Sequence, residues 1–342
     1  MRSEPAPPAF QQFAIGFDRR DLPRVMGYWE EIVRSHQWVE GKFTQLFEEK
    51  WAAWNGLPAV ATSSWAGAAL ACLEYVGVRG KKVLCPTNTF MATPLSIIKA
   101  GGEVVFGDCR RDDLCLSYEA VEQAAREHEL AAVWLVHIGG HVAFDVERIA
   151  AFCQARGIVL LEDCAHAHGA SWHGKKPGTW GDAGVYSFYG TKTISTGEGG
   201  MLVSRHPDLI EFARRYRNYG KPDYQIEGLN YRMSEFTAAV GVVQVDRLEE
   251  MVAWKNHVAT TFLDPRFEAR LRLPEGMVSG RYKYIVFEPI EQSSGKVYDT
   301  LCHTILRHPG SFPNAEWIAA HHWCVPLYYQ PTEALTVERA AA

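Results

Sequence analysis

A single lysine stands within residues 187–200, where small and glycine residues otherwise dominate. Lys192 follows a short apolar segment at residues 184–188 and precedes a glycine-rich run at residues 197–200. An amine between a strand and a tight turn is poorly hydrated, so its pKa is expected to fall, and its neutral form can attack a carbonyl carbon. The position therefore favours Schiff-base formation.

Asp163 is the second residue of chemical interest, because it directly follows the expected strand at residues 158–162, whose first four residues are apolar. A carboxylate at the end of a strand can keep a pyridine nitrogen protonated, so that the ring accepts electrons. A lysine on a later loop can form the Schiff base with the same ring system, and a pyridoxal phosphate enzyme needs both groups. Asp163 and Lys192 together predict pyridoxal phosphate chemistry.

The elements that must position these residues follow an alternating pattern from about residue 58 to residue 204. Continuous apolar strands separated by helices are typical of a mostly parallel sheet covered on both faces. We expect strands at residues 60–62, 82–85, 103–106, 132–136, 158–161, 184–188 and 200–204, and helices at 66–75, 93–99, 118–128 and 146–156. Ligands bind near the carboxyl ends of such strands. The residues expected near these ends are Pro86, Asp108, His137, Asp163 and Ser187.

A long helical segment begins after Ser234 and runs from residue 235 to about residue 257. It resembles the connector between a large and a small domain. The other elements expected outside the sheet are helices at residues 24–34, 43–54, 298–307 and 317–322 and a strand at residues 283–287.

The composition excludes several classes of function. The 342 residues, 47% of them apolar, are enough for one large domain and a smaller one. The net charge of −5 gives no basic surface for nucleic acid. No apolar run reaches the ~20 residues of a membrane span, and the N-terminus has no apolar signal core. The eight cysteines show no CxxC spacing and the histidines no zinc-like spacing, so we expect free thiols, a cytoplasmic protein and no metal site.

Four motifs stand out along the chain: PTNTFMAT at residues 86–93, LEDCAHAHGA at 161–170, SFYGTKTISTGEGG at 187–200 and NYRMSE at 230–235. As a set they resemble the P-x-x-T-[FW]-x-A-T, E-D-x-A-Q-A-x-G-A, S-F-x-x-x-K with T-G-E-G-G, and N-Y-R-M-S-E motifs of the DegT/DnrJ/EryC1 family of sugar aminotransferases. The resemblance covers about residues 43–255.

The resemblance implies an α/β fold, the aspartate-aminotransferase fold (fold type I) of pyridoxal-phosphate-dependent transferases. A mostly parallel seven-stranded sheet would form a large cofactor-binding domain at residues 40–245. A smaller α+β domain would combine residues 1–39 and 246–342 and be shortened at its C-terminal end.

The resemblance also implies a role for each matching position. Lys192 would form the Schiff base with pyridoxal 5'-phosphate and move the proton, and Asp163 would pair with the pyridine nitrogen. The other cofactor contacts would be Phe90 stacked on the ring, Gly67, Ala68 and Ser187 on the phosphate, and Asn230, which in this family reaches the phosphate of the neighbouring subunit. The active unit would be a homodimer with shared sites.

The chain departs from the family pattern in two motifs. His166 stands where the family has a glutamine that contacts the 3-oxygen of the cofactor. A histidine could make the same hydrogen bond, but its charge state would couple to the Schiff base. The phosphate loop usually reads S-G-T-A-A-L, whereas residues 64–70 read SWAGAAL, so a threonine hydroxyl is missing and backbone amides must contribute more.

The function that the resemblance implies is transfer of an amino group from glutamate or glutamine to a keto-sugar, in particular a nucleotide-linked 3- or 4-keto-hexose. Tyr219, Lys221 and Tyr224 are the candidates for substrate contact. A keto-inositol acceptor of an aminocyclitol pathway is an alternative that no residue separates from a nucleotide sugar. A branch that removes a sugar hydroxyl carries histidine in place of the lysine, so Lys192 argues against it. A non-catalytic regulatory homologue is the alternative from another class.

Overall fold

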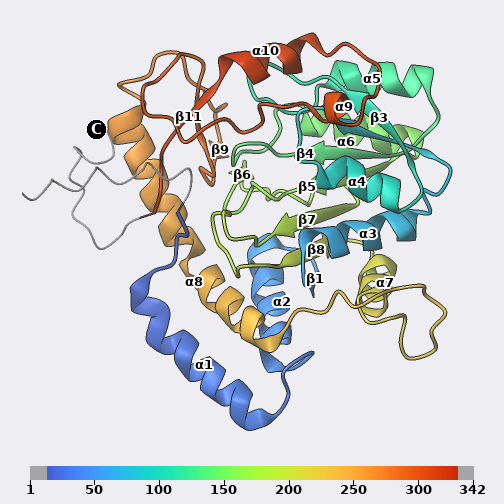
Figure 1. Cartoon of the computed structure of the whole chain (residues 1–342), viewed down its shortest axis with the longest axis vertical. Coiled ribbons are helices and arrows are strands. Elements are labelled where there is room, and N and C mark those ends of the chain that lie inside the picture. The colour runs from blue at the N-terminus through green and yellow to red at the C-terminus, as the bar shows by residue number, and fades with distance from the viewer. Residues whose placement is uncertain (1–13, 330–342) are drawn as a thin grey trace, which may run out of the picture.

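The computed structural model describes residues 14–329, and a mostly parallel sheet of seven strands forms its centre (Figure 1). The strand order is β1-β8-β7-β5-β4-β2-β3. Only β8 runs antiparallel to its neighbours, whereas β7, β5, β4, β2 and β3 pair in parallel. The strands are β1 (Ala59–Thr62), β2 (Lys82–Pro86), β3 (Glu103–Gly107), β4 (Leu130–Val136), β5 (Val159–Asp163), β7 (Ala183–Ser187) and β8 (Gly200–Ser204). The sheet predicted from the sequence is confirmed.

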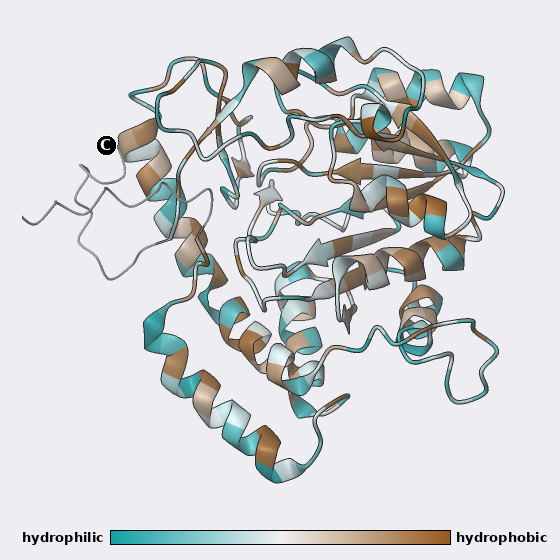
Figure 2. Ribbon diagram, viewed as in Figure 1, coloured by the Kyte–Doolittle hydropathy of each residue, from teal (hydrophilic) through white to brown (hydrophobic). Residues whose placement is uncertain are grey.

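Helices flank this sheet and close its hydrophobic core (Figure 1). Apolar residues gather on the central strands and on the inward faces of the helices (Figure 2). The core is fully buried at Trp51 and Trp134, among many others. The helices around the sheet are α2 (Lys42–Asn55), α3 (Trp65–Val76), α4 (Ala92–Lys99), α5 (Tyr118–Glu127), α6 (Val146–Arg156) and α7 (Pro207–Tyr216).

The long helix α8 (Glu235–Val258) begins at Ser234, whose side chain accepts a hydrogen bond from the backbone N–H of Thr237. Such an N-cap supplies a partner for an otherwise unpaired amide. Along its length α8 packs against α2 and against α1 (Leu22–Ser35), which follows the short helix η1 (Arg19–Asp21). The helix expected from residue 235 to about residue 257 is thus confirmed.

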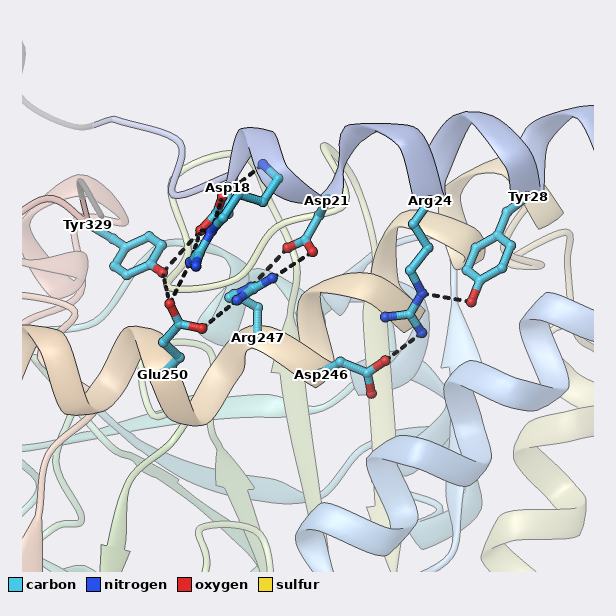
Figure 3. A network of polar contacts seen from close by, with 9 residues as sticks. Asp18, Asp21, Arg24, Tyr28, Asp246, Arg247, Glu250 and Tyr329 are labelled. Carbon is cyan, nitrogen blue, oxygen red and sulfur yellow. Dashed lines mark hydrogen bonds and ion pairs between the residues drawn. The ribbon is translucent and has the colours of Figure 1, made fainter. Parts of the chain in front are cut away.

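A network of charged side chains joins α1 to α8 (Figure 3). Arg247 on α8 pairs with Asp21 at 2.7 Å, and Arg24 on α1 pairs with Asp246 at 2.6 Å. The hydroxyl of Tyr329 lies 3.1 Å from Glu250 Oε1, so the end of the described chain joins the same network (Figure 3).

The remaining elements form small units beside the main sheet. β10 (Tyr284–Val286) pairs antiparallel with β11 (Trp323–Val325), and β6 (Ser171–Trp172) pairs with β9 (Met277–Val278). A second cluster of buried apolar side chains supports this region: Val258, Ala259, Leu263, Tyr284, Val286, Val325 and Leu327. Leu263 ends the short π-helix η2 (Ala259–Leu263).

Two expected helices near the C-terminus differ from the structure. The helix expected at residues 298–307 is wrong, because only α9 (Cys302–Ile305) is helical there. The backbone N–H groups of Val297 and Cys302 donate instead to His322 Nε2 and to the carbonyl of Thr87, at 2.9 and 2.8 Å. These tertiary bonds replace the bonds that a longer helix would need. The last helix, α10 (Pro313–His321), begins earlier than expected, because a proline is well suited to the first helical position.

Within residues 14–329, no helix combines the length and the apolar character needed to cross a bilayer.

Candidate active site

A cavity of about 580 Å³ opens at the carboxyl ends of β4, β5 and β7. Its wall combines the start of α3, the loop after β7 and a segment between residues 282 and 298 that is irregular apart from β10. Segments from distant parts of the sequence therefore meet at the edge of the sheet where parallel α/β proteins bind ligands. The predicted site residues that line it are Phe90, Asp163, His166, Ser187 and Lys192.

Lys192 lies on the loop between β7 and β8 and is partly buried. Its backbone N–H donates to the carbonyl of Tyr189 at 2.9 Å, which fixes the loop. Burial lowers the pKa of the amine to about 8, and the nearby Asp163 carboxylate partly opposes this effect. The ammonium lies 5.0 Å from the ring centroid of Tyr282. A substantial neutral fraction near neutral pH makes Lys192 a competent nucleophile and base.

Asp163 is the last residue of β5 and is buried. Its Oδ1 accepts hydrogen bonds from Trp65 Nε1 and from the backbone N–H of Ala165, both at 3.1 Å. Its Oδ2 accepts one from the hydroxyl of Thr93, also at 3.1 Å. Burial raises the pKa of Asp163, while the hydrogen bonds and Lys192 act in the opposite direction. Donors on both oxygens favour the ionised carboxylate.

His166 lies in the wall of the cavity between two tyrosine rings. Its ring is stacked on Tyr282 with a centroid distance of 4.1 Å, and lies 5.9 Å from Tyr298. Burial, with the charge of Lys192, holds the pKa of His166 well below its usual range, so the ring is neutral. Among the described residues, Nδ1 of His166 has no hydrogen-bond partner although it is buried.

The start of α3 forms the opposite end of the cavity, where Ser64, Trp65 and Ala66 line the wall. Ser64 is the N-cap, and its hydroxyl accepts a hydrogen bond from the N–H of Gly67 at 3.3 Å. A helix N-terminus of this kind attracts anions. Gly67 and Ala68 are buried and do not line the cavity. At this end the cavity wall is formed by Ser64, Trp65 and Ala66 instead.

The remaining predicted residues lie outside this cavity. Asn230 is exposed, and its side-chain oxygen accepts a hydrogen bond from the N–H of Arg232. Tyr219, Lys221 and Tyr224 are exposed on the same long loop. The role predicted for Asn230 involves a second subunit, so its assignment stays a prediction, as do the substrate contacts of the other three residues.

Sequence reasoning missed several residues of the wall. Trp65 was noted only as a departure from the usual loop, although its position beside the N-cap was a usable signal. Tyr282, Lys283, Lys296 and Tyr298 come from a segment with little regular structure, and no motif pointed to them.

Two buried groups of side chains have metal-ligating atoms close together, Asp113 with Cys115 and His141, and His137 with Glu162 and Cys164. Both have structural explanations. The Glu162 carboxylate accepts the N–H groups of Gly178, Trp180 and Gly181 and contacts His137 Nε2 at 2.8 Å. The Asp113 carboxylate accepts the N–H groups of Cys115 and Phe144.

The cavity fits pyridoxal 5'-phosphate. Phe90 is 68% exposed although it lines the cavity, so one ring face is free to stack on a planar group. Lys192 can supply an amine, Asp163 a carboxylate, and the α3 N-terminus with Ser187 a place for the phosphate. The unpartnered Nδ1 of His166 offers a further polar contact.

Several known proteins are similar to this chain in sequence or in fold. The GDP-perosamine synthase of Vibrio cholerae is 34% identical over 234 residues, which are 66% of this chain and 63% of that protein. The dTDP-3-amino-3,4,6-trideoxy-α-D-glucose transaminase of Micromonospora megalomicea subsp. nigra is 30% identical over 341 residues, 90% of this chain and 91% of that protein. The structure also resembles the crystal structure of the aminotransferase TlmJ from Streptoalloteichus hindustanus, with a TM-score of 0.87 and 26% sequence identity. The superposition covers 97% of this chain and 96% of the TlmJ chain.

The fold type predicted from the sequence is confirmed by this structural similarity. The sequence profile of the DegT/DnrJ/EryC1/StrS aminotransferase family matches residues 23–269. The chain therefore belongs to the DegT/DnrJ/EryC1/StrS aminotransferase family.

Proposed function

We propose that this protein is a pyridoxal 5'-phosphate-dependent aminotransferase that moves an amino group from glutamate or glutamine to a keto-sugar, specifically a nucleotide-linked 3- or 4-keto-hexose. The observation that carries the proposal is the convergence of Lys192 and Asp163 on one cavity with an exposed aromatic face at Phe90. The sugar part of the proposal is supported by the names of two relatives, which refer to GDP- and dTDP-linked sugars.

The cofactor, when bound, supplies an electron-accepting ring that stabilises negative charge on the carbon bearing the amino group. Lys192 Nζ accepts the proton from that carbon of the amino donor and later delivers a proton in the reverse direction to the sugar. Its pKa of about 8 suits both roles at neutral pH. Three donors bind the oxygens of Asp163 and favour its ionised form, which would supply the negative charge that a protonated pyridine nitrogen requires.

The walls of the cavity orient the reacting groups. The N-terminus of α3 and Ser187 would hold the phosphate, and Phe90 would cover one face of the ring. Because amino donor and keto-sugar use the same cavity in turn, the donor's keto acid leaves before the sugar binds. Ping-pong kinetics are expected.

The homodimer belongs to this proposal. Asn230 is exposed and lies outside the cavity of its own chain, which is compatible with a role at the phosphate of a second chain. Leu22, Met26 and Val33 on α1 are about half exposed and share one helical face, an apolar surface suited to a second subunit. The division into domains at residues 40–245 and in the flanking segments is likewise proposed.

Replacement of the lysine tests the proposal. The purified protein should bind pyridoxal 5'-phosphate with the visible absorbance of a lysine-bound cofactor, and glutamate should abolish that absorbance. Adding a keto-sugar nucleotide or a keto-inositol should restore it, and the acceptor that does so identifies the substrate class. Lys192→Ala should lose both the absorbance and the transfer. A protein that stays colourless with added cofactor would instead be a regulatory homologue.

A further inference from the structure

Lys283 presents a cation to the cavity without an anionic partner. It lines the wall, and within residues 14–329 its ammonium has no ion pair and no hydrogen bond; it lies 5.5 Å from the ring centroid of Tyr282. Lys296 differs, because its ammonium donates to the carbonyls of Ala319 and Ala320 at the end of α10. Lys283 is therefore a free donor of three N–H groups on the cavity wall.

The carboxylates of the cavity do not balance this charge. Asp163 and Glu198 are the acidic residues of the described wall. Asp163 already accepts three hydrogen bonds, and Glu198 is exposed to solvent. Behind the wall, Lys255 is buried and donates to the carbonyl of Arg281 at 3.3 Å rather than to a carboxylate. This side of the cavity has an excess of positive charge, and a bound anion would relieve it.

The position of Lys283 is fixed by the main sheet. Its backbone N–H donates to the carbonyl of Gly139 at 2.9 Å, and Gly280 donates to Gly140 at 2.7 Å, just beyond the end of β4. A Cβ atom on Gly140 would approach the backbone nitrogen of Tyr282 to 2.5 Å, so only glycine allows this close contact. The backbone of Lys283 is consequently fixed at the cavity wall before any ligand binds, while its side chain keeps its rotational freedom.

We propose that Lys283 binds the α-carboxylate of the amino donor; this inference rests on the proposed aminotransferase function. The ammonium groups of Lys192 and Lys283 lie 5.0 and 5.5 Å from the same ring centroid, so their separation cannot exceed the sum of these distances. In an α-amino acid the nitrogen and a carboxylate oxygen are about 3 Å apart, and an ammonium–carboxylate hydrogen bond adds about 2.8 Å. The two lengths sum to about 6 Å. An amino donor whose nitrogen replaces that of Lys192 reaches Lys283 once the flexible lysine side chain brings its ammonium to within that distance.

The test separates the two half-reactions of the cofactor-loaded protein. Lys283→Met keeps an unbranched side chain, one atom shorter, and removes the charge. The apparent dissociation constant for glutamate in the first half-reaction should rise about tenfold, with a smaller change in the limiting rate. Lys283→Arg should recover most of the loss. Glutamine should be affected as much as glutamate, since both carry an α-carboxylate.

Three results would overturn the assignment. An effect confined to the half-reaction with the keto-sugar nucleotide would identify the sugar diphosphate as the ligand. An effect on glutamate but not on glutamine would identify the side-chain carboxylate. Unchanged constants in both half-reactions would exclude an anion-binding role.

A binding measurement keeps this proposal separate from the proposed function. Succinate binding by calorimetry requires no turnover, and it should weaken about tenfold in Lys283→Met. Lys81→Met is the matched control, because Lys81 is exposed just before β2, at the opposite end of the strands. A protein without transaminase activity that still loses succinate binding in Lys283→Met would refute the function and leave the anion site standing.

Discussion

The indole Nε1 of Trp65 donates a 3.1 Å hydrogen bond to Oδ1 of Asp163. Trp65 is the first residue of α3, whose N-terminus faces the cavity, whereas Asp163 ends β5. One side chain thus connects the end of the cavity suited to a phosphate with the carboxylate suited to a pyridine nitrogen. A shift of α3 would move a hydrogen-bond donor of Asp163 with it.

Trp65→Phe should change the pH dependence of the reaction. Phenylalanine can still pack on Trp134, whose ring lies 5.5 Å away, but it removes the donor to Asp163. Burial already raises the pKa of Asp163, and the loss of a donor to the ionised form should raise it further. The acidic limb of the kcat/KM profile should therefore move to higher pH. A hydrogen bond to a charged group contributes about 1.5–3 kcal/mol, so kcat/KM near neutral pH should fall about tenfold.

The matched control for this change is Trp172→Phe. Its indole N–H donates to the carbonyl of Glu275 at 3.2 Å, outside the cavity. This variant should retain the profile of the original protein. An identical acidic limb in Trp65→Phe and in the control would contradict the role assigned to the indole.

Lys192→Met should stabilise the cofactor-free protein at neutral pH. Burial lowers the pKa of Lys192 from 10.5 to about 8, so between these values the folded state binds fewer protons than the unfolded state. The unfavourable contribution to stability is complete below about pH 8 and disappears as the pH rises toward 10.5. At pH 7 the free energy of unfolding, measured with urea, should rise by about 3 kcal/mol, the equivalent of this pKa difference.

The pH dependence distinguishes this effect from a general gain in packing. The difference between Lys192→Met and the original protein should shrink as the pH is raised through the range between the two pKa values. Lys81→Met, at an exposed position, should show no such trend. A constant difference at all pH values would show that burial of the charge is not its cause.

His166→Gln should leave the pH profile near neutrality unchanged. The ring of His166 is held neutral by burial between Tyr282 and Tyr298, so it does not titrate in this range. A glutamine amide can make the polar contact that the free Nδ1 offers. Activity should stay within about threefold from about pH 6 to 8. An inflection near pH 6.5 that is present in the original protein and absent from the variant would show that His166 titrates.

The part of the site that could be predicted from the sequence lies in continuous motifs. Asp163 and Lys192 could be predicted because Asp163 ends one buried strand of the main sheet and Lys192 lies on the loop that follows another. The strands of the mostly parallel sheet and the helices between them followed from the alternation of apolar runs and helical segments. These signals come from residues that are neighbours in the sequence, so a single sequence is enough to detect them.

The rest of the site depends on contacts between distant segments. Tyr282 and Lys283 reach the cavity because the backbone N–H groups of Lys283 and Gly280 donate to the carbonyls of Gly139 and Gly140. No hydrophobic periodicity in residues 279–300 indicates these contacts. Tyr298 was expected in a helix, but its neighbours bond to Thr87 and His322 instead. The helix propensity of residues 298–307 was therefore outweighed by hydrogen bonds to distant parts of the chain.

The network on α8 has a consequence for how the chain opens. The hydroxyl of Tyr329 lies 3.3 Å from Asp18, a residue 311 positions earlier, and 3.1 Å from Glu250 on α8 (Figure 3). Arg20 pairs with both Asp18 and Glu250. The two ends of the described chain are therefore both linked to the same helix, α8. Amide hydrogens in α1 and those around Tyr329 should exchange with solvent as one cooperative unit, so that cutting the chain before α1 would also release its far end.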